Sequence, residues 1–195
     1  MLKLNEVSIR FGAKQVLDSC SLVLEKGQRA ALMGPSGCGK TTLARAALSL
    51  QVPDSGTVRC SFQRVAAVFQ EPRLLPWATA EENVNLVLSD RPETMPQARA
   101  WLDALELSEA ASLYPAELSG GMQQRLSIAR ALAYEPELLI MDEPFKAMDD
   151  ALKSRILKVT ASSITSAALL LITHSREEAA ALGCRILQFE DGRFC

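Results

Sequence analysis

A glycine-rich segment that ends in lysine and threonine is the strongest chemical signal in this 195-residue sequence. It fits the pattern G-x-x-x-x-G-K-[ST], in which glycines let backbone N–H groups converge on phosphate oxygens. The lysine of such a loop reaches the β- and γ-phosphates of a nucleotide, and the hydroxyl after it binds Mg²⁺. The residues predicted to bind the nucleotide here are Gly34, Pro35, Ser36, Gly37, Cys38, Gly39, Lys40, Thr41 and Thr42.

The sequence around this loop also favours an anion site. A short apolar run at residues 29–33 precedes it, and a helix is expected from about Lys40 to Leu50. No acidic residue occupies the first turn of that helix, so the partial positive charge at its N-terminus is left for an anion. The alternative is an ordinary glycine-rich turn with a surface lysine.

Two carboxylates follow a second apolar run, Leu138–Met141. Taken alone, such a pair is more often a helix cap or a surface feature. Beside a phosphate loop, we predict that Asp142 binds Mg²⁺ and that Glu143 is the base for an attacking water. Because the residue before a proline is kept out of the right-handed helical region, Pro144 predicts an extended backbone at Glu143.

The only histidine, His174, ends a third apolar strand pattern. A single histidine is usually structural. Here Gly34, Asp142 and His174 all stand at the ends of expected strands, and open α/β sheets bind ligands beyond the carboxyl ends of their strands. We therefore predict a catalytic contact between His174 and the γ-phosphate.

A second helix start is predicted at Leu118–Arg125, LSGGMQQR. Ser119 is a suitable N-cap, and the helix is expected to run to about Tyr134. Its first turn also lacks an acidic residue, so a second helix N-terminus is open to an anion. Without the other motifs, the segment would be an ordinary capped helix preceded by glycines.

The hydrophobic pattern predicts the elements that must position these residues. Strands alternate with helices in the C-terminal part, which favours a mainly parallel sheet covered by helices. The expected strands are residues 2–9 and 16–24 (an antiparallel pair), 29–33, two within 57–69, 138–142, 169–173 and 186–189. The expected helices are residues 40–50, several within 77–133, about 150–164 and 175–182.

These elements predict an α/β fold of the P-loop NTPase type. A mainly parallel sheet would form the core, with an antiparallel β subdomain at the N-terminal side and an inserted helical subdomain. We predict a single nucleotide-binding domain over residues 1–195, with its core at about 1–72 and 136–195 and its helical subdomain at about 73–135.

The composition excludes several other classes of protein. Hydrophobic residues make up 48% and charged residues 23%, as in globular domains. The formal net charge is −2 and no basic cluster occurs, so we predict no nucleic-acid partner. The five cysteines are scattered without a C-x-x-C pair, which favours a reduced, cytosolic protein over a zinc or disulfide scaffold. No apolar run approaches the length of a membrane span, and the N-terminus is not a signal peptide.

Together these motifs resemble those of the ATP-binding cassette (ABC) ATPases, over essentially the whole chain. LSGGMQQR is similar to the signature sequence of that family. The resemblance implies that two copies form a head-to-tail homodimer in the ATP-bound state, in which the phosphate loop of one chain and the signature of the other enclose each ATP. Ser119, Gly120, Gly121 and Gln123 would then face the ATP held by the partner copy.

The same resemblance implies further site residues. Gln70 matches the glutamine loop, which touches Mg²⁺ and senses the membrane partner. Residues 145–149 stand where the D-loop of the family lies, with Asp149 as its aspartate. Phe11 falls where the family stacks an aromatic ring on adenine; the alternative is a core aromatic at a strand end. Within the D-loop, Lys146 replaces a small residue, usually serine, and Met148 replaces the usual leucine.

The segment FQEPRLLPW at residues 69–77, followed by EPF at residues 143–145, is similar to importers of the nitrate, sulfonate, taurine and thiamine-precursor group. The resemblance thus implies the ATP-hydrolysing subunit of an ABC importer. It would associate with integral-membrane permease subunits at the cytoplasmic side of the inner membrane, and an extracytoplasmic solute-binding protein would deliver the substrate. One alternative is an ABC-type clamp that acts outside the membrane. Another is a P-loop small-molecule kinase.

Overall fold

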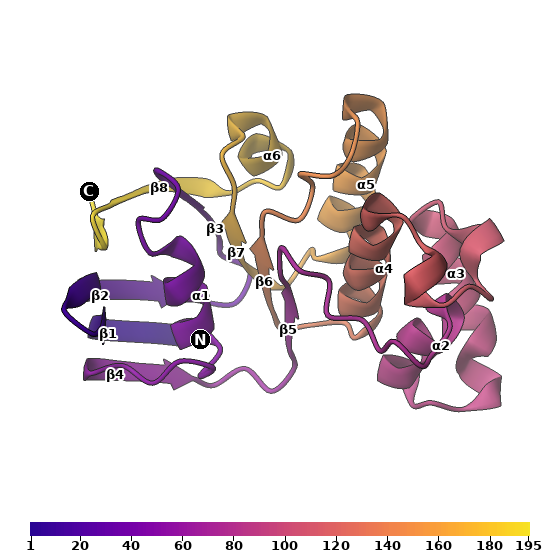
Figure 1. Ribbon diagram of the computed structural model, residues 1–195, viewed down its shortest axis with the longest axis horizontal. Coiled ribbons are helices and arrows are strands. Elements are labelled where there is room, and N and C mark those ends of the chain that lie inside the picture. The colour runs from indigo at the N-terminus through magenta and orange to yellow at the C-terminus, as the bar shows by residue number, and fades with distance from the viewer. The chain divides into compact units, whose positions relative to one another are not determined.

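Alternating residues at the start of the chain form an antiparallel sheet in the computed structural model, which describes residues 1–195 (Figure 1). Strand β1 (Leu2–Phe11) lies between β2 (Lys14–Leu24) and β4 (Ser55–Cys60). The buried side chains of β1 alternate up to Leu4 and restart at Val7, because the register shifts at Glu6, whose backbone is left-handed (φ 50).

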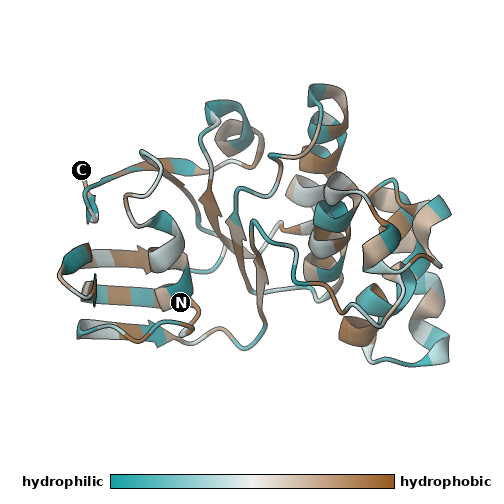
Figure 2. Ribbon diagram, viewed as in Figure 1, coloured by the Kyte–Doolittle hydropathy of each residue, from teal (hydrophilic) through white to brown (hydrophobic).

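The longest apolar runs form the parallel sheet. Strands β6 (Leu138–Asp142), β7 (Ala168–Ile172), β3 (Arg29–Met33) and β8 (Arg185–Glu190) follow one another in that order and run parallel. Every residue of β6 and β7 is buried, and β7 is brown along its length in Figure 2. Burial on both faces is the usual environment of parallel strands.

A short hairpin ends this sheet. Strand β8 turns at Asp191 and Gly192 into β9 (Arg193–Phe194), and the two strands pair antiparallel. The rings of Phe189 and Phe194 meet edge to face, with their centroids 5.2 Å apart. The hairpin thus carries its own small apolar contact beside the parallel sheet.

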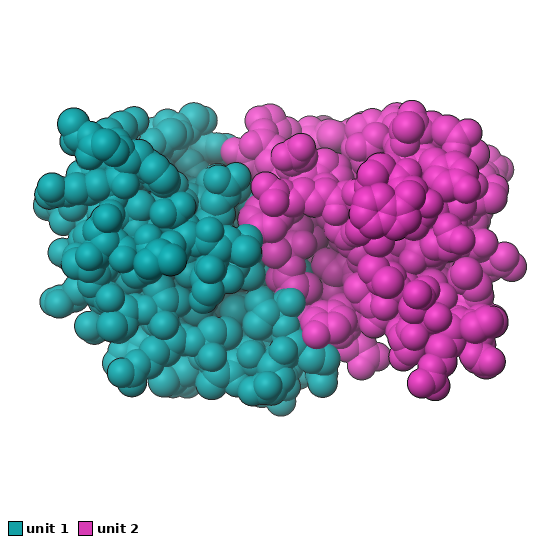
Figure 3. Space-filling view, turned by 60° about the horizontal axis from the view of Figure 1, so that its bottom comes forward, with its two compact units in different colours: residues 1–65, 137–142, 166–195 teal, residues 66–136, 143–165 magenta.

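The chain forms two compact units, coloured separately in Figure 3. Unit 1 comprises residues 1–65, 137–142 and 166–195, and it contains the strands described above together with helices α1 (Lys40–Ala47) and α6 (Arg176–Ala181). Its apolar core joins Leu43 of α1 to side chains of both sheets, including Leu4, Leu32 and Leu170.

Unit 2 comprises residues 66–136 and 143–165 and is mainly helical. Strand β5 (Val65–Val68) lies where the chain passes into it. Its α-helices are α2 (Ala80–Asn85), α3 (Met95–Ala104), α4 (Gly120–Ala133) and α5 (Asp150–Ser163). Short 3-10 turns connect them: η1 (Leu86–Leu88), η2 (Pro92–Thr94), η3 (Ser108–Ala110) and η4 (Pro115–Glu117).

The predicted fold class is confirmed, and the principal strands and helices lie where the pattern predicted them. The first helix is shorter than expected: α1 ends at Ala47 because Ser49 adopts a left-handed backbone (φ 58). Strand β9 was not predicted, since two residues are too few to show a period. None of the helices combines the length and apolar character needed to cross a membrane.

Candidate ATP-binding and hydrolysis site

The phosphate loop connects the end of β3 to the start of α1 in unit 1. Gly37 (φ 78) and Gly39 (φ 108) take left-handed backbone conformations that other residues rarely adopt. No side chain caps the N-terminus of α1, and no acidic residue occupies its first turn. The loop and the helix therefore present backbone N–H groups and a partial positive charge, the arrangement that binds phosphate.

Lys40 carries the charge of this loop. Its side chain is buried, with only 6% of the residue exposed, and its ammonium donates to the carbonyl oxygens of Gly34 at 2.8 Å and Pro35 at 2.6 Å. The ammonium thus lies within the loop itself, where the phosphates of a P-loop nucleotide bind.

Thr41 and Asp142 join the loop to the end of β6. The Thr41 hydroxyl donates to Asp142 Oδ2 at 2.7 Å, although the two residues are 101 positions apart. Asp142 is a buried carboxylate with 4% exposure. A hydroxyl and a carboxylate side by side supply the oxygen ligands that Mg²⁺ prefers, so this pair fits the ion. No group of three or more His, Cys, Asp or Glu side chains suggests another metal centre.

The β8–β9 hairpin supports the phosphate loop closely. The Gly192 N–H donates to the Cys38 carbonyl at 3.1 Å, and the Cys38 thiol lies 3.4 Å from the Phe189 carbonyl. A Cβ atom on Gly34 would come within 1.7 Å of that same Phe189 oxygen. Only glycine therefore fits at Gly34 without movement of one of these backbones.

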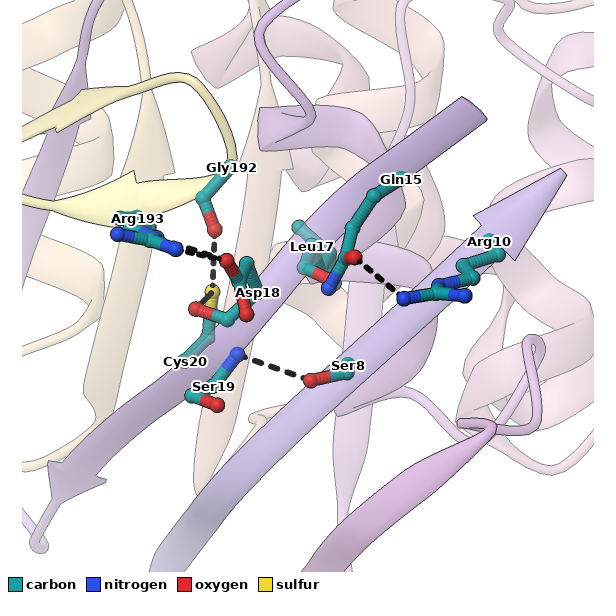
Figure 4. A network of polar contacts seen from close by, with 9 residues as sticks. All are labelled: Ser8, Arg10, Gln15, Leu17, Asp18, Ser19, Cys20, Gly192 and Arg193. Atoms are coloured by element: carbon teal, nitrogen blue, oxygen red, sulfur yellow. Dashed lines mark hydrogen bonds and ion pairs between the residues drawn. The ribbon is translucent and has the colours of Figure 1, made fainter. Parts of the chain in front are cut away.

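Hydrogen bonds and an ion pair also connect the hairpin to β2, as Figure 4 shows. The Gly192 carbonyl accepts from the Asp18 N–H and from the Cys20 thiol, both at 2.9 Å. The Arg193 guanidinium forms an ion pair with the Asp18 carboxylate, and Arg193 Nε donates to Asp18 Oδ2 at 2.9 Å. Burial raises the pKa of the Cys20 thiol above its ordinary value, so the thiol stays protonated as the donor.

These hairpin contacts were not found from the sequence. The turn residues Asp191 and Gly192 give a weak signal, because such a dipeptide favours a tight turn between strands. Nothing in that signal says that the turn lies against residues 34–39, some 150 positions earlier in the chain; Cys38 and Phe189 are 151 positions apart.

His174 and Phe11 are both exposed in unit 1. His174 follows β7 in a turn whose neighbours are fixed: the Ser175 N–H donates to the Thr173 hydroxyl at 3.0 Å, and the Ser175 hydroxyl accepts from the Glu178 N–H at 3.2 Å. Phe11 ends β1 with 52% of the residue exposed, so it is not the core aromatic of the alternative interpretation.

Glu143 differs from the prediction made for its backbone. It directly follows Asp142 in the chain and is the first residue of this segment that belongs to unit 2. Its φ is 47°, in the left-handed region, so the predicted extended backbone is wrong. Proline excludes only the right-handed helical region at the preceding residue, and the sharp turn after β6 is built on the left-handed region instead. Its carboxylate accepts a hydrogen bond from Lys146 Nζ at 3.0 Å.

The glutamine-loop region of unit 2 is tied to α4. Gln70 is exposed, and the Phe69 carbonyl just before it accepts from the buried Gln124 Nε2 at 3.1 Å. The half-buried Arg130 donates to the carbonyl of Arg73 at 2.9 Å. Trp77, a few residues further on, is 73% exposed. The segment after Gln70 thus has a fixed backbone and an exposed aromatic side chain.

The signature segment has the predicted helix start. The Ser119 hydroxyl accepts from the Met122 N–H at 3.3 Å, which confirms Ser119 as the N-cap of α4. Gln123 Nε2 donates to the carbonyls of Pro115 at 2.9 Å and Leu118 at 3.1 Å, so this amide holds the approach to the helix. Gly120 is open to solvent, and a Cβ on it would meet nothing within 4 Å.

The signature segment and the D-loop both belong to unit 2. A Cβ on Gly121 would lie 3.0 Å from the Ala147 carbonyl, so the signature and the D-loop approach each other closely. Asp149 is the N-cap of α5: its Oδ1 accepts from the Leu152 N–H at 3.0 Å. This backbone hydrogen bond holds the pKa of the Asp149 carboxyl below its ordinary value.

Comparison with known proteins adds independent evidence on the family. Residues 17–146 match the family model described as ABC transporter. The chain is 42% identical to the aliphatic sulfonates import ATP-binding protein SsuB of Granulibacter bethesdensis, over 99% of this chain and 81% of that protein. It is also 42% identical to SsuB 3 of Paraburkholderia xenovorans, over 94% of this chain and 74% of that protein.

Solved structures agree with the sequence comparison. A dimeric ATP-binding cassette in a post-hydrolysis state, bound to ADP and Pi, superposes with a TM-score of 0.86 at 29% identity, covering 100% of this chain and 96% of that chain. A dimeric bacterial ABC transporter cassette gives a TM-score of 0.87 with the same identity and coverage. On this evidence the chain belongs to the family of ABC transporter ATPases, which bind and hydrolyse ATP.

Proposed function

We propose that this ABC ATPase powers import by hydrolysing ATP at a site built on its phosphate loop and the end of β6. The contact of 2.7 Å between the Thr41 hydroxyl and Asp142 is the observation that carries the proposal, because it joins the nucleotide loop to the acidic strand end. Thr41, Asp142 and Gln70 would hold Mg²⁺, which neutralises charge on the phosphate oxygens when bound.

The remaining residues of the loop and strand ends have distinct roles in this proposal. Lys40 and the backbone N–H groups of residues 34–42 bind the phosphates, and Phe11 stacks on the adenine ring. Glu143 accepts a proton from the water that attacks the γ-phosphorus, as the bond from that phosphorus to ADP breaks. His174 donates a hydrogen bond to the γ-phosphate.

A second copy of the chain completes each site. Ser119, Gly120, Gly121 and Gln123 of one copy face the ATP bound by the other, and Asp149 contributes to the contact between the copies. The exposed Gly120 and the capped helix start at Ser119 support this role, because they leave backbone N–H groups accessible to an anion. ATP then favours the closed dimer over the open one, and hydrolysis reverses that preference.

The transport partner is proposed from the relatives. The two SsuB proteins are named as import subunits for aliphatic sulfonates, and we propose a substrate of the same anionic class. Integral-membrane permease subunits would bind the segment around the exposed Trp77, at the cytoplasmic side of the inner membrane. An extracytoplasmic solute-binding protein would deliver the sulfonate.

One experiment tests this assignment against its alternatives. The tagged chain is expressed in its own cells and purified together with whatever membrane proteins bind to it. Release of inorganic phosphate from ATP is then measured with and without Mg²⁺. We expect Mg²⁺-dependent release of inorganic phosphate and co-purification of an integral-membrane protein. Isolation of a ribosome or DNA complex without any membrane protein would favour the clamp, and a phosphorylated small molecule would favour the kinase.

A further inference from the structure

The proposed base, Glu143, is paired with a lysine of its own turn. Lys146 Nζ donates to Glu143 Oε2 at 3.0 Å. The Glu143 side chain is 19% exposed and the Lys146 side chain 65% exposed, so the pair lies at the rim of the unit with the lysine on the solvent side.

The backbone of the turn keeps the two side chains within reach of each other. Phe145, between them, is almost completely buried, with 1% exposure, and Pro144 is buried as well. The Lys146 N–H lies 3.5 Å from the Glu143 carbonyl, and the Met148 N–H donates to the Phe145 carbonyl at 3.2 Å. The anchored turn thus fixes the backbone on which the two side chains stand, and the ammonium of Lys146 lies at hydrogen-bond distance from the Glu143 carboxylate.

This pairing opposes the chemistry assigned to Glu143. A general base must offer a carboxylate lone pair to water and must gain a proton during the reaction. A hydrogen-bonded ammonium occupies part of that acceptor capacity, so Glu143 Oε2 has fewer lone pairs to offer to an attacking water. We propose that Lys146 is a positioning residue that restrains Glu143 and keeps hydrolysis slow until its ammonium is displaced, an inference that rests on the proposed role of Glu143.

The exposure of Lys146 makes such a restraint reversible. A solvent-exposed ion pair is weak, since water competes for both partners. Closing of a second copy over the D-loop is an event that would offer the ammonium new partners and release the base. The restraint would thus keep a chain without its partner from consuming ATP.

The test is the steady-state ATPase rate of the wild-type protein and of Lys146→Ser, Lys146→Arg and Lys153→Ser. Lys153 is the matched control, because its ion pair with Asp150 has the same i,i+3 spacing and the same 3.0 Å distance but lies in α5. We expect Lys146→Ser to raise kcat about two- to fivefold with KM for ATP unchanged, the range that loss of an exposed pair allows. Lys146→Arg and Lys153→Ser should stay near the wild-type rate.

Glu143→Gln separates this inference from the proposed function. If turnover stops in Glu143→Gln while Lys146→Ser leaves kcat unchanged or lowers it, the restraint is wrong and the base remains. If Glu143→Gln hydrolyses ATP at the wild-type rate, the proposed base is wrong and the restraint is overturned with it. A rise in kcat that also occurs in Lys146→Arg would exclude the ion pair as the cause.

Discussion

Lys40 occupies a position that would be unfavourable without the carbonyl groups around it. Its ammonium is removed from solvent, and the oxygens of Gly34 and Pro35 replace part of its hydration. These hydrogen bonds therefore offset part of the desolvation free energy of the ammonium before any nucleotide binds. A phosphate that enters the loop meets a cation already in place, which lowers the reorganisation needed on binding.

Replacement of Lys40 by alanine should weaken ATP binding by about 10- to 100-fold, the range for loss of hydrogen bonds to a charged group. Titration with a fluorescent ATP analogue measures this directly. Lys158→Ala, which removes an exposed lysine of α5, should bind ATP like the wild type. Equal affinity in Lys40→Ala and the wild type would mean that the lysine does not contact the phosphates.

Gly34 has no room for even one extra carbon. Its alanine variant would place Cβ 1.7 Å from the Phe189 carbonyl oxygen. The position of a Cβ is fixed by its own backbone, and the oxygen belongs to the backbone of Phe189, so no side-chain rotation relieves the clash. We expect Gly34→Ala to lower the free energy of unfolding by about 1–3 kcal/mol, as overpacking does, and to lower the Tm by several degrees. Gly120→Ala is the control, since its Cβ meets nothing within 4 Å. An unchanged melting curve for Gly34→Ala would contradict the close approach.

At the scale of elements, local pattern was sufficient for most strands and helices. Alternation predicted β1 and β2, and uninterrupted apolar runs predicted β6 and β7, because each pattern reports the burial of its own segment. The turn at Glu143 was predicted wrongly, since the rule for residues before proline excludes one backbone region without selecting among the others.

Contacts between distant segments could not be read from the pattern in the same way. The proximity of Thr41 and Asp142 was expected because both follow predicted strands, and open α/β sheets bind ligands beyond the carboxyl ends of their strands. No sequence pattern predicted the hydrogen bond between the Gly192 N–H and the Cys38 carbonyl of the loop. The Lys146–Glu143 pair depends on side-chain rotamers in a turn of unusual backbone, which composition does not specify.

Cys184, in the turn between α6 and β8, should make the free energy of unfolding fall at alkaline pH. Burial raises the pKa of the Cys184 thiol from its ordinary 9.0 to about 11. Between those values the unfolded chain has lost the thiol proton while the folded chain keeps it, so the unfolded state binds fewer protons. Stability is thus fully present below pH 9 and falls as the pH rises toward 11.

Denaturant unfolding of the wild type, Cys184→Ala and Cys60→Ala at pH 8 and pH 10 tests this sensitivity. Between the two pH values, the wild type should lose about 1 kcal/mol more stability than Cys184→Ala, after allowance for the partial exposure of the thiol. Cys60 is exposed, so Cys60→Ala should behave like the wild type. If Cys184→Ala loses as much stability as the wild type, other groups cause the alkaline effect.

At the scale of the whole molecule, the two units each carry part of the proposed catalytic machinery. Unit 1 holds the phosphate loop, Asp142 and His174, whereas unit 2 holds Gln70 and the signature segment. The boundary falls between Asp142 and Glu143, so two acidic neighbours in the sequence belong to different units. The residue proposed to bind Mg²⁺ and the residue proposed as the base are therefore consecutive in the chain but are assigned to different units.

Loss of the base should reveal the assembled dimer. Glu143→Gln keeps the size of the side chain and should still bind ATP, but it should reduce turnover at least 100-fold, because a positioned base contributes about that much. Trapped ATP should then hold two chains together, visible as a dimer peak in size-exclusion chromatography with Mg²⁺ and ATP. With ADP in place of ATP, the same variant should elute as a monomer.

The β8–β9 hairpin at Gly192 also bears on the order in which the phosphate loop and its supporting backbone are synthesised. Cys38 and Phe189, which meet beside the loop, are separated by 151 positions, so a ribosome needs on the order of 10 s to reach the second after the first. During that interval the nascent loop has its glycines and its lysine but lacks the backbone that braces it. The backbone that braces the phosphate loop is thus made only after every residue of unit 2 has been synthesised.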